Sequence, residues 1–381
     1  QCLVGSEMCI RDRTMNISDF DSYTFFPGQH WSHTWERQHE LITRFADWLT
    51  GSDLYVCSPL GLINHNPLSK DFFSRIGHYI RSQQSEITGT QNPVRSNMKL
   101  KNVLHVPLHS SLTGKINYNL MKRYLRFSPK NNFFWSTYMN PTVYEFFKRS
   151  RFRVYDIAER RSKNPLLTPR ILEWEKRAVA EADIVFADNM ATIGDYESLN
   201  DIIYLPQGVN IDTFYELVDN REYIGYIGNL HFAIDYDFLA KLIELNKVEE
   251  FLIIGGILDD RAASILSYPN VKYIPQISKR ELNQYLAKMK IGLIPYAVNE
   301  HTVGVYPTKL FEYLAANVPV LSTPLPEVKQ YENKEYLKIM ESPISLAGLS
   351  FTMKGKDRLI EANTWDKRWE IYQNEILRCL K

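Results

Sequence analysis

The chain has 381 residues, of which 44% are hydrophobic, so it is long enough for two domains with separate cores. Its 45 basic and 44 acidic residues nearly cancel, and no apolar run reaches the length of a membrane span. Four cysteines are too few for a disulfide framework, which excludes a small disulfide-rich scaffold and favours a reducing compartment. We therefore expect a cytoplasmic protein, at most peripheral to the inner face of a membrane.

The first residues, QCLVGSEMCIRDR, show no periodicity that joins them to the rest of the chain. They resemble a translated sequencing adapter. We interpret Met15 as the biological start and leave residues 1–14 out of the fold prediction as a non-native prefix.

From Tyr23 onward, short apolar segments alternate with amphipathic ones at regular spacing. This alternation is typical of a parallel sheet with helices on both faces, so the predicted fold class is α/β. Residues 60–100 are polar and irregular and predict no element. In the first half we predict helices at 34–49 and 169–182, and strands at 23–26, 54–57, 103–107, 153–157, 184–188 and 202–205.

Two of these strands end in candidate site residues. The loop after the first strand of a doubly wound sheet borders the ligand crevice, so we expect Gly28, His30 and Trp31 to face a cleft. His109 follows the predicted strand at 103–107, where a neutral imidazole can hydrogen-bond a substrate hydroxyl or a developing charge. For both histidines the alternative is an ordinary structural role.

A basic segment at residues 115–153 mixes cations with Phe, Trp and Tyr. Thirteen Lys or Arg residues stand against three acids between residues 115 and 170. Cations beside amphipathic rings suit an anionic membrane surface. Single-stranded nucleic acid is the competing ligand, but no nucleic-acid motif accompanies the segment and we expect none. The alternative is a solvated face whose aromatic residues pack in the core.

The second half repeats the strand and helix pattern, and we place the linker at Pro206–Gly208. The predicted division is an N-terminal domain at 15–208, a C-terminal domain at 209–360 and a final helix at 361–381. Helices begin at Asp235, Asp259 and Ser278, and the predicted strands are 223–227, 251–254, 271–274, 291–296 and 319–321.

Residues 306–323 organise the predicted site, because they read as a loop, a helix and a buried strand in succession. Pro307 and Thr308 open the helix, and its amino end binds anions through unpaired N–H groups. Lys309 in the first turn would neutralise a pyrophosphate, and Glu312 on the same face would bind two neighbouring ribose hydroxyls. The alternative is a surface ion pair.

Three further residues complete the predicted site. Gly228 and Asn229 allow a phosphate or sugar to approach the backbone, and Tyr296 would stack on a base or touch the diphosphate, with edge packing as its alternative. Gly225 and Gly228 form only half of a glycine fingerprint, which is weak support for a nicotinamide cofactor. We expect no cofactor and no metal, since no His or Cys cluster supports coordination.

The pattern P-x-K-x-x-E-Y-L-A-A-x-x-P-V at residues 307–320 resembles the donor-site signature of GT-B glycosyltransferases. The chain is similar to retaining family four and to the surface-polysaccharide branch that resembles teichuronic acid and xanthan glucuronosyltransferases. This resemblance runs from about Phe25 to the C-terminus. It implies two Rossmann-like domains that face one another across a cleft, with the final helix crossing back to the N-terminal domain.

The chain departs from this family pattern in two places. Many retaining members carry a second glutamate eight residues before Glu312, where this chain has Gly304. Other members clamp the diphosphate with an Arg and a Lys after the first strand of the C-terminal domain, but neither occurs between Gly228 and Asp237. Retention and inversion of the sugar's configuration therefore both stay open.

The resemblance implies transfer of a sugar from a nucleoside-diphosphate sugar to a saccharide or lipid-linked acceptor in bacterial surface polysaccharide synthesis. In similar enzymes an acid at the exit of the strand at 153–157 faces the cleft, so Asp156 is the candidate base for an inverting reaction. Its alternatives are a helix cap or a partner for Arg160 or Arg161. Two other functions stay open, a nucleotide-sugar epimerase or hydrolase of the same fold and a non-catalytic nucleotide-binding subunit of a synthase.

Overall fold

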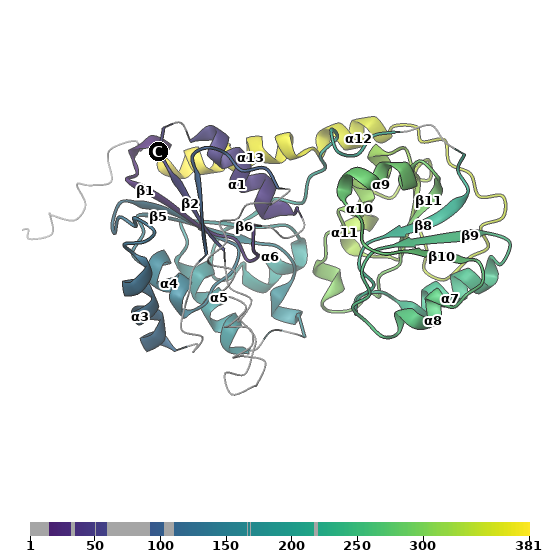
Figure 1. The fold of residues 1–381 in the computed structure, drawn as a ribbon, viewed down its shortest axis with the longest axis horizontal. Helices are drawn as coiled ribbons and strands as arrows, with labels where there is room; N and C mark the ends of the chain where they lie inside the picture. The colour runs from purple at the N-terminus through teal and green to yellow at the C-terminus, as the bar shows by residue number, and fades with distance from the viewer. Residues whose placement is uncertain are drawn as a thin grey trace, which may run out of the picture.

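The computed structural model describes residues 15–31, 35–49, 51–58, 92–102, 110–165, 167, 169–216 and 220–381. These residues form two α/β domains side by side, each built around one parallel sheet (Figure 1). The predicted pair of Rossmann-like domains is therefore confirmed. Residues 1–14, the predicted strand at 103–107 and His109 lie outside the described residues.

The first sheet has seven parallel strands in the order β3-β2-β1-β4-β5-β6-β7. The chain order reverses between β1 and β4, which places a ligand crevice outside the carboxyl ends of these two strands. Sequence patterns do not predict β3 or β4. The strands are β1 (Ser22–Phe26), β2 (Leu54–Ser58), β3 (Met98–Asn102), β4 (Asn132–Ser136), β5 (Phe152–Ile157), β6 (Ile184–Ala187) and β7 (Ile202–Tyr204).

Strand β4 corrects our interpretation of the basic segment. Phe133, Phe134 and Trp135 are fully buried at the centre of the sheet and are not available to a membrane surface. Successive side chains of a strand point to opposite faces, so Phe133 and Trp135 join one core of the domain and Phe134 the other. The interfacial role predicted for these rings is wrong, and the alternative of core packing holds for them.

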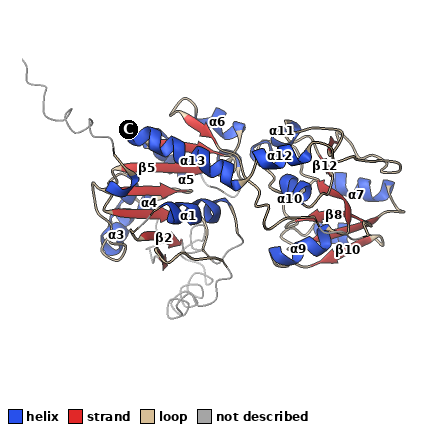
Figure 2. Cartoon of the chain, turned by 90° about the horizontal axis from the view of Figure 1, so that it is seen from above, coloured by secondary structure: helices blue, strands red, loops and turns tan. Residues whose placement is uncertain are grey.

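Two layers of helices cover the first sheet, one on each face (Figure 2). One face carries α1 (Arg37–Trp48) and the last helix of the chain, α13 (Trp365–Leu380). The opposite face carries α3 (Ser111–Met121), α4 (Pro141–Phe147), α5 (Pro169–Glu181) and α6 (Met190–Tyr196).

The second sheet has six parallel strands in the order β10-β9-β8-β11-β12-β13, and its chain order reverses between β8 and β11. These strands are β8 (Tyr223–Ile227), β9 (Glu250–Ile254), β10 (Val271–Ile274), β11 (Met289–Ile294), β12 (Val320–Ser322) and β13 (Leu337–Ile339). The helices of this domain are α7 (Tyr236–Leu245), α8 (Ala262–Leu266), α9 (Lys279–Leu286), α10 (Lys309–Ala315), α11 (Pro326–Lys329) and α12 (Lys356–Ala362).

The chain crosses between the domains twice, and the two crossings are bonded to each other. Val209 and Thr364 form a parallel bridge, with Val209 N donating to Asn363 O at 3.0 Å and Trp365 N donating to Val209 O at 3.1 Å. A Cβ on Gly208 would lie 2.8 Å from Trp365 N, so this close approach requires glycine. The predicted division at residue 208 falls within this crossing.

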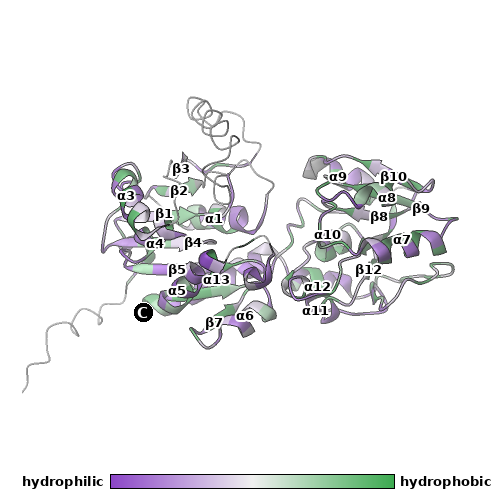
Figure 3. Cartoon of the chain, turned by 90° about the horizontal axis from the view of Figure 1, so that it is seen from below, coloured by the Kyte–Doolittle hydropathy of each residue, from purple (hydrophilic) through white to green (hydrophobic). Residues whose placement is uncertain are grey.

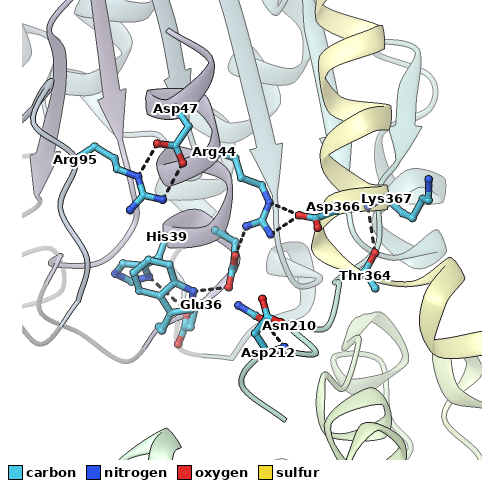
Figure 4. A network of polar contacts seen from close by, with 12 residues as sticks. Glu36, His39, Arg44, Asp47, Arg95, Asn210, Asp212, Thr364, Asp366 and Lys367 are labelled. Atoms are coloured by element: carbon cyan, nitrogen blue, oxygen red, sulfur yellow. Dashed lines mark hydrogen bonds and ion pairs between the residues drawn. The ribbon is translucent and has the colours of Figure 1, made fainter. Parts of the chain in front are cut away.

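After the second crossing, α13 returns to the N-terminal domain and packs against α1 (Figure 1). Figure 4 shows the polar part of this contact, in which Arg44 of α1 donates to Asp366 of α13 at 2.8 Å. Beneath it, the ring of Tyr372 stacks on Phe186 of β6 with centroids 4.6 Å apart. The end of the chain is thus part of the first domain's core.

The packing of Tyr372 gives a stability prediction. We expect Tyr372→Ala to lower the free energy of unfolding by about 3 kcal/mol, because it leaves a cavity between α13 and β6. Tyr372→Phe should leave stability unchanged or raise it, since the buried hydroxyl has no hydrogen-bond partner among the described residues. Urea denaturation measures both variants, with Ile371→Ala on the exposed side of the same helix as the control. Equal losses for the Phe and Ala variants would show that the hydroxyl of Tyr372, and not its ring, stabilises this contact.

Candidate functional site

A cluster of side chains gathers at the point where the second sheet reverses its order. Lys309 is the first residue of α10, and its Nζ donates a hydrogen bond to Tyr296 Oη at 2.9 Å. The same Nζ lies 5.7 Å from the centroid of the Tyr226 ring. A Cβ on Gly228 would lie only 2.5 Å from Lys309 Cε. The structure thus brings together Lys309, Tyr296 and Gly228, three of the predicted donor-binding residues.

Two glycines make this close packing possible. Gly228 has a φ of +144° and Gly255 a φ of +152°, backbone conformations that residues with a side chain rarely adopt. A Cβ on Gly255 would lie 2.1 Å from Gly228 O, so the loops after β8 and β9 contact each other through their backbones. Asn229 fastens this contact, because its Oδ1 accepts a hydrogen bond from Gly256 N at 3.0 Å.

The charge of Lys309 is maintained by its neighbours. Burial alone would lower the pKa of the ammonium, but the hydrogen-bonded Tyr296 oxygen and the carboxylate of Glu312 outweigh it and raise the pKa above its ordinary value. Lys309 is therefore a fixed positive charge at neutral pH. A fixed cation at the carboxyl edge of a parallel sheet is suited to binding an anionic group.

Helix α10 begins at Lys309, two residues later than predicted, with Thr308 as its N-cap. Pro307 precedes it in a tighter turn, in which Leu310 N donates to Pro307 O at 3.2 Å. Pro307 and Thr308 therefore lead into the helix and do not form its first turn. Glu312 follows one turn after Lys309 and is half-buried.

His231 is a candidate residue that the sequence interpretation missed. Its ring lies at the same strand ends, with its centroid 5.8 Å from that of Tyr296. Burial, the charge of Lys309 and the neighbouring imidazole of His301 together lower the pKa of His231 to about 4. The signal that could have identified it is a histidine three residues after Gly228, in a segment that has neither Arg nor Lys to bind a diphosphate.

The residues predicted at the N-terminal face of the cleft are placed differently from one another. Gly28 N donates to Thr137 Oγ1 at 2.7 Å, and both Gly28 and His30 are half-buried just after β1. Trp31 is fully buried in the core of the first domain, so the prediction that it faces the cleft is wrong. The size of the indole ring explains the difference, because burying it in the core stabilises the fold more than leaving it exposed in a cleft. His109 is outside the described residues.

Asp156 lies in the last two residues of β5, at the predicted strand exit, but is not exposed. Its carboxylate is 0% exposed and pairs with Arg37 of α1, which is 2% exposed, through a 2.8 Å contact from Nη2 and two 3.1 Å contacts from Nε. Arg37 Nη1 also donates to Leu205 O at 2.7 Å. A carboxylate enclosed in this way does not reach an acceptor hydroxyl. We therefore replace the predicted base with the alternative of an arginine partner, which is Arg37 and not Arg160 or Arg161.

The loop at 297–305 touches the N-terminal domain. Arg160 Nη1 donates to Glu300 O at 2.9 Å, and a Cβ on Gly304 would lie 2.2 Å from Arg160 Cβ. A glutamate in place of Gly304 would collide with Arg160 in this arrangement. The departure from the family pattern at this position therefore coincides with a contact between the domains.

The described residues contain neither a membrane-spanning helix nor a metal-binding cluster. None of their helices is long and apolar enough to cross a bilayer. In the same part of the chain, no three His, Cys, Asp or Glu side chains gather in a group that could hold a metal ion.

Comparison with known proteins places a family domain over this site. Residues 221–347 match the family model described as glycosyl transferases, group 1. A curated relative is TuaH of Bacillus subtilis (strain 168), whose name assigns it provisionally to teichuronic acid biosynthesis as a glycosyltransferase. The two are 27% identical over 121 residues, which is 31% of this chain and 30% of TuaH. The match thus spans about a third of the length of that relative.

Solved structures match nearly the whole chain. Sucrose-phosphate synthase from Thermosynechococcus elongatus superposes with a TM-score of 0.67 at 12% identity, over 94% of this chain and 99% of the other. HepE from Anabaena in complex with UDP gives a TM-score of 0.60 at 11% identity, over 93% and 99%. The chain has the GT-B glycosyltransferase fold. The predicted GT-B architecture is confirmed. The group 1 match covers most of the C-terminal domain, which contains Lys309.

The buried ion pair of Arg37 and Asp156 in the N-terminal domain gives a second prediction. We expect Asp156→Asn and Arg37→Met each to lower the free energy of unfolding by about 3 to 5 kcal/mol, because each leaves the other partner with fewer contacts in a buried site. The double variant should lose less than the sum of the two.

Chemical denaturation measures this cycle, and Arg95→Met is the control, because Arg95 forms an exposed pair with Asp47 on the helix that carries Arg37. An Asp156→Asn protein with unchanged stability but little transferase activity would instead restore the role of a base.

Proposed function

We propose that the protein is a glycosyltransferase that moves a sugar from a nucleoside-diphosphate sugar to a saccharide or lipid-linked acceptor. The observation that carries this proposal is the cluster of Lys309, Tyr296 and Gly228 at the order reversal of the second sheet. Ligands of parallel sheets bind at such a reversal, and here the residues lie within the matched group 1 domain. The solved complexes of HepE with UDP and with UDP-glucose favour a uridine nucleotide.

Each residue of the cluster has a role in this proposal. Lys309 binds the diphosphate and neutralises the charge that accumulates on it as the sugar leaves, the role that a divalent ion has in other architectures. Gly228 leaves room for the alkyl chain of Lys309, which brings the ammonium group to the diphosphate, and Glu312 binds the ribose hydroxyls. In this mechanism the transfer needs no resident metal. The name of TuaH supports a surface polysaccharide as the context.

Two other functions share this donor site and are separated by one assay. A nucleotide-sugar epimerase or hydrolase would consume the donor without an acceptor. A non-catalytic subunit would bind the nucleotide and transfer nothing. The sugar donor, incubated with and without an extract of membrane lipids, distinguishes them, because the transferase alone needs the acceptor for rapid turnover.

We expect Lys309→Ala to weaken nucleotide binding roughly ten- to a hundredfold, since it removes a charge-assisted hydrogen bond to the diphosphate. Thermal shift with UDP, GDP and ADP and their glucose conjugates measures the effect. Lys354→Ala, an exposed lysine of the same domain, is the matched control. A Lys309→Ala protein that keeps every stabilisation of the parent would show that the donor binds elsewhere.

For membrane contact we propose the outer face of α3 in place of the buried rings of β4. Leu112, Ile116 and Leu120 recur every four residues and are 69%, 44% and 67% exposed, and Tyr124 follows one turn later at 51%. Figure 3 shows hydrophobic and hydrophilic segments on this helix. Residues 110–130 contain five basic residues and no acidic one. An apolar stripe flanked only by cations complements an anionic bilayer, which would also bring a lipid-linked acceptor to the enzyme.

A hollow of about 750 Å³ beside the C-terminal end of α3 extends this basic surface. Glu145 pairs with Lys148 and Arg149, but the structure gives the other three cations of the lining no carboxylate partner among the described residues. These three suit lipid phosphate groups. The hollow is lined by Tyr118, Asn119, Lys122, Pro129, Lys130, Lys148, Arg149, Ser150 and Arg151.

We expect the double variant Leu112→Gln/Leu120→Gln to lose roughly tenfold or more of its binding to vesicles rich in phosphatidylglycerol, since two apolar anchors are removed. Sedimentation with vesicles measures the bound fraction. The control is Leu245→Gln/Val248→Gln, which changes two residues 58% and 93% exposed on the other domain. Equal loss in both double variants, or no binding by the parent, would count against this face.

A further inference from the structure

His231 lies in the donor site but has no part in the function proposed above. It follows β8 by four residues, and its ring is half-buried between the rings of Tyr296 and Phe232, with centroids 5.8 Å and 5.7 Å away. Tyr296 is also the hydrogen-bond partner of Lys309. One phenol ring thus separates a fixed cation from an imidazole.

The backbone fixes the tautomer of this imidazole. Ala233 N donates to His231 Nδ1 at 3.3 Å, so in the neutral ring Nδ1 is the acceptor and Nε2 carries the proton. The structure gives Nε2 no hydrogen-bond partner among the described residues. The ring is therefore anchored by one nitrogen and presents an N–H with the other.

We propose that His231 binds the diphosphate of the donor together with Lys309, and that the imidazole takes up a proton when the nucleotide binds. This inference rests on the proposed function, because it deepens the description of the same donor site. It supplies a second cationic contact in the segment between Gly228 and Asp237, where the chain has neither Arg nor Lys.

The charges around His231 explain why the proton arrives with the ligand. Burial, the cation of Lys309 on α10 and the neighbouring imidazole of His301 on the 297–305 loop lower the pKa of His231 to about 4, and Asp259, after β9, opposes them. Two phenols also lie beside His231, Tyr296 two residues after β11 and Tyr236 on α7, and burial raises the pKa of Tyr236 to about 12. Without a ligand the ring is therefore uncharged at neutral pH.

A bound diphosphate reverses this balance. Its negative charge offsets the repulsion from Lys309 and attracts an imidazolium, so the pKa of His231 rises in the complex. Between about pH 4 and the pKa of the complex, the complex holds one more proton than the free protein, and the solvent supplies it. Affinity then falls by up to about tenfold per pH unit as the pH rises through this window, and is flat above it.

Calorimetry in two buffers with different ionisation enthalpies counts the protons taken up on binding. The probes are UDP, GDP and ADP at about pH 6, close to the ordinary pKa of histidine. We expect uptake by the parent protein that His231→Asn loses, together with a roughly fivefold or greater loss of affinity that shrinks at higher pH. Asn Oδ1 can still accept from Ala233 N, so the turn is preserved. UDP-glucose serves as a further probe, because its diphosphate is esterified at both ends and has no ionisation of its own at about pH 6.

His301→Asn is the matched control, because it removes a neighbouring imidazole and should keep the proton uptake. Binding of a nucleotide by the parent with no uptake beyond that of His231→Asn would overturn this inference and leave the glycosyltransferase proposal intact. If none of the three nucleotides binds the parent protein, both proposals are overturned. If His231→Asn is unstable, His231→Gln takes its place in the comparison.

Discussion

The candidate site depends on a constraint of the backbone, the absence of side chains at two glycines in the second sheet. Gly228 and Gly255 adopt backbone conformations that other residues rarely hold, and their loops touch at a distance that a Cβ would prevent. The space left above Gly228 is filled by the alkyl chain of Lys309. An ammonium group is thereby held over the strand ends by packing, and its hydrogen bond to Tyr296 fixes its direction. A glycine in this position does more to place the cation than the short helix that carries it.

The N-terminal domain obeys a different constraint, which is the arrangement of its aromatic residues. Rings from β1, β4 and β5 lie on both faces of the sheet, and the last helix of the chain seals one of these faces. The domain therefore requires the chain to return after the second domain has been built. The ion pair of Arg37 and Asp156 belongs to this framework, because it joins α1 to β5 and, through Leu205, to the start of the first crossing.

Much of the fold was predictable because the apolar periodicity agrees with the positions of turn and helix-capping residues along most of the sequence. The predicted bounds of β8 and β10 match the structure, and those of β5 differ by one residue. β4 was not predictable in the same way, since its rings lie among Lys and Arg and a buried aromatic strand then resembles an interfacial surface. Only tertiary packing separates these two interpretations.

Within the site, residues tied to local sequence rules were easier to predict than those set by long-range contacts. Gly228 was predicted from a strand exit and Lys309 from a helix start, although they are far apart in the chain. The enclosure of Asp156 depends on an arginine 119 residues away, and no spacing in the sequence reveals it. The same holds for His231, whose electrostatic surroundings come from three separate loops and helices.

The bonded pair of crossings at Val209 and Thr364 limits how the two domains can move. Two separate tethers would allow one domain to slide or tilt freely over the other. Two crossings that are hydrogen-bonded side by side act as one hinge, so the expected low-energy motion is a rotation about their common direction. Such a twist would separate the 297–305 loop from Arg160 while leaving both cores untouched. Substrate entry would then be governed by rotation of rigid bodies and not by local unfolding.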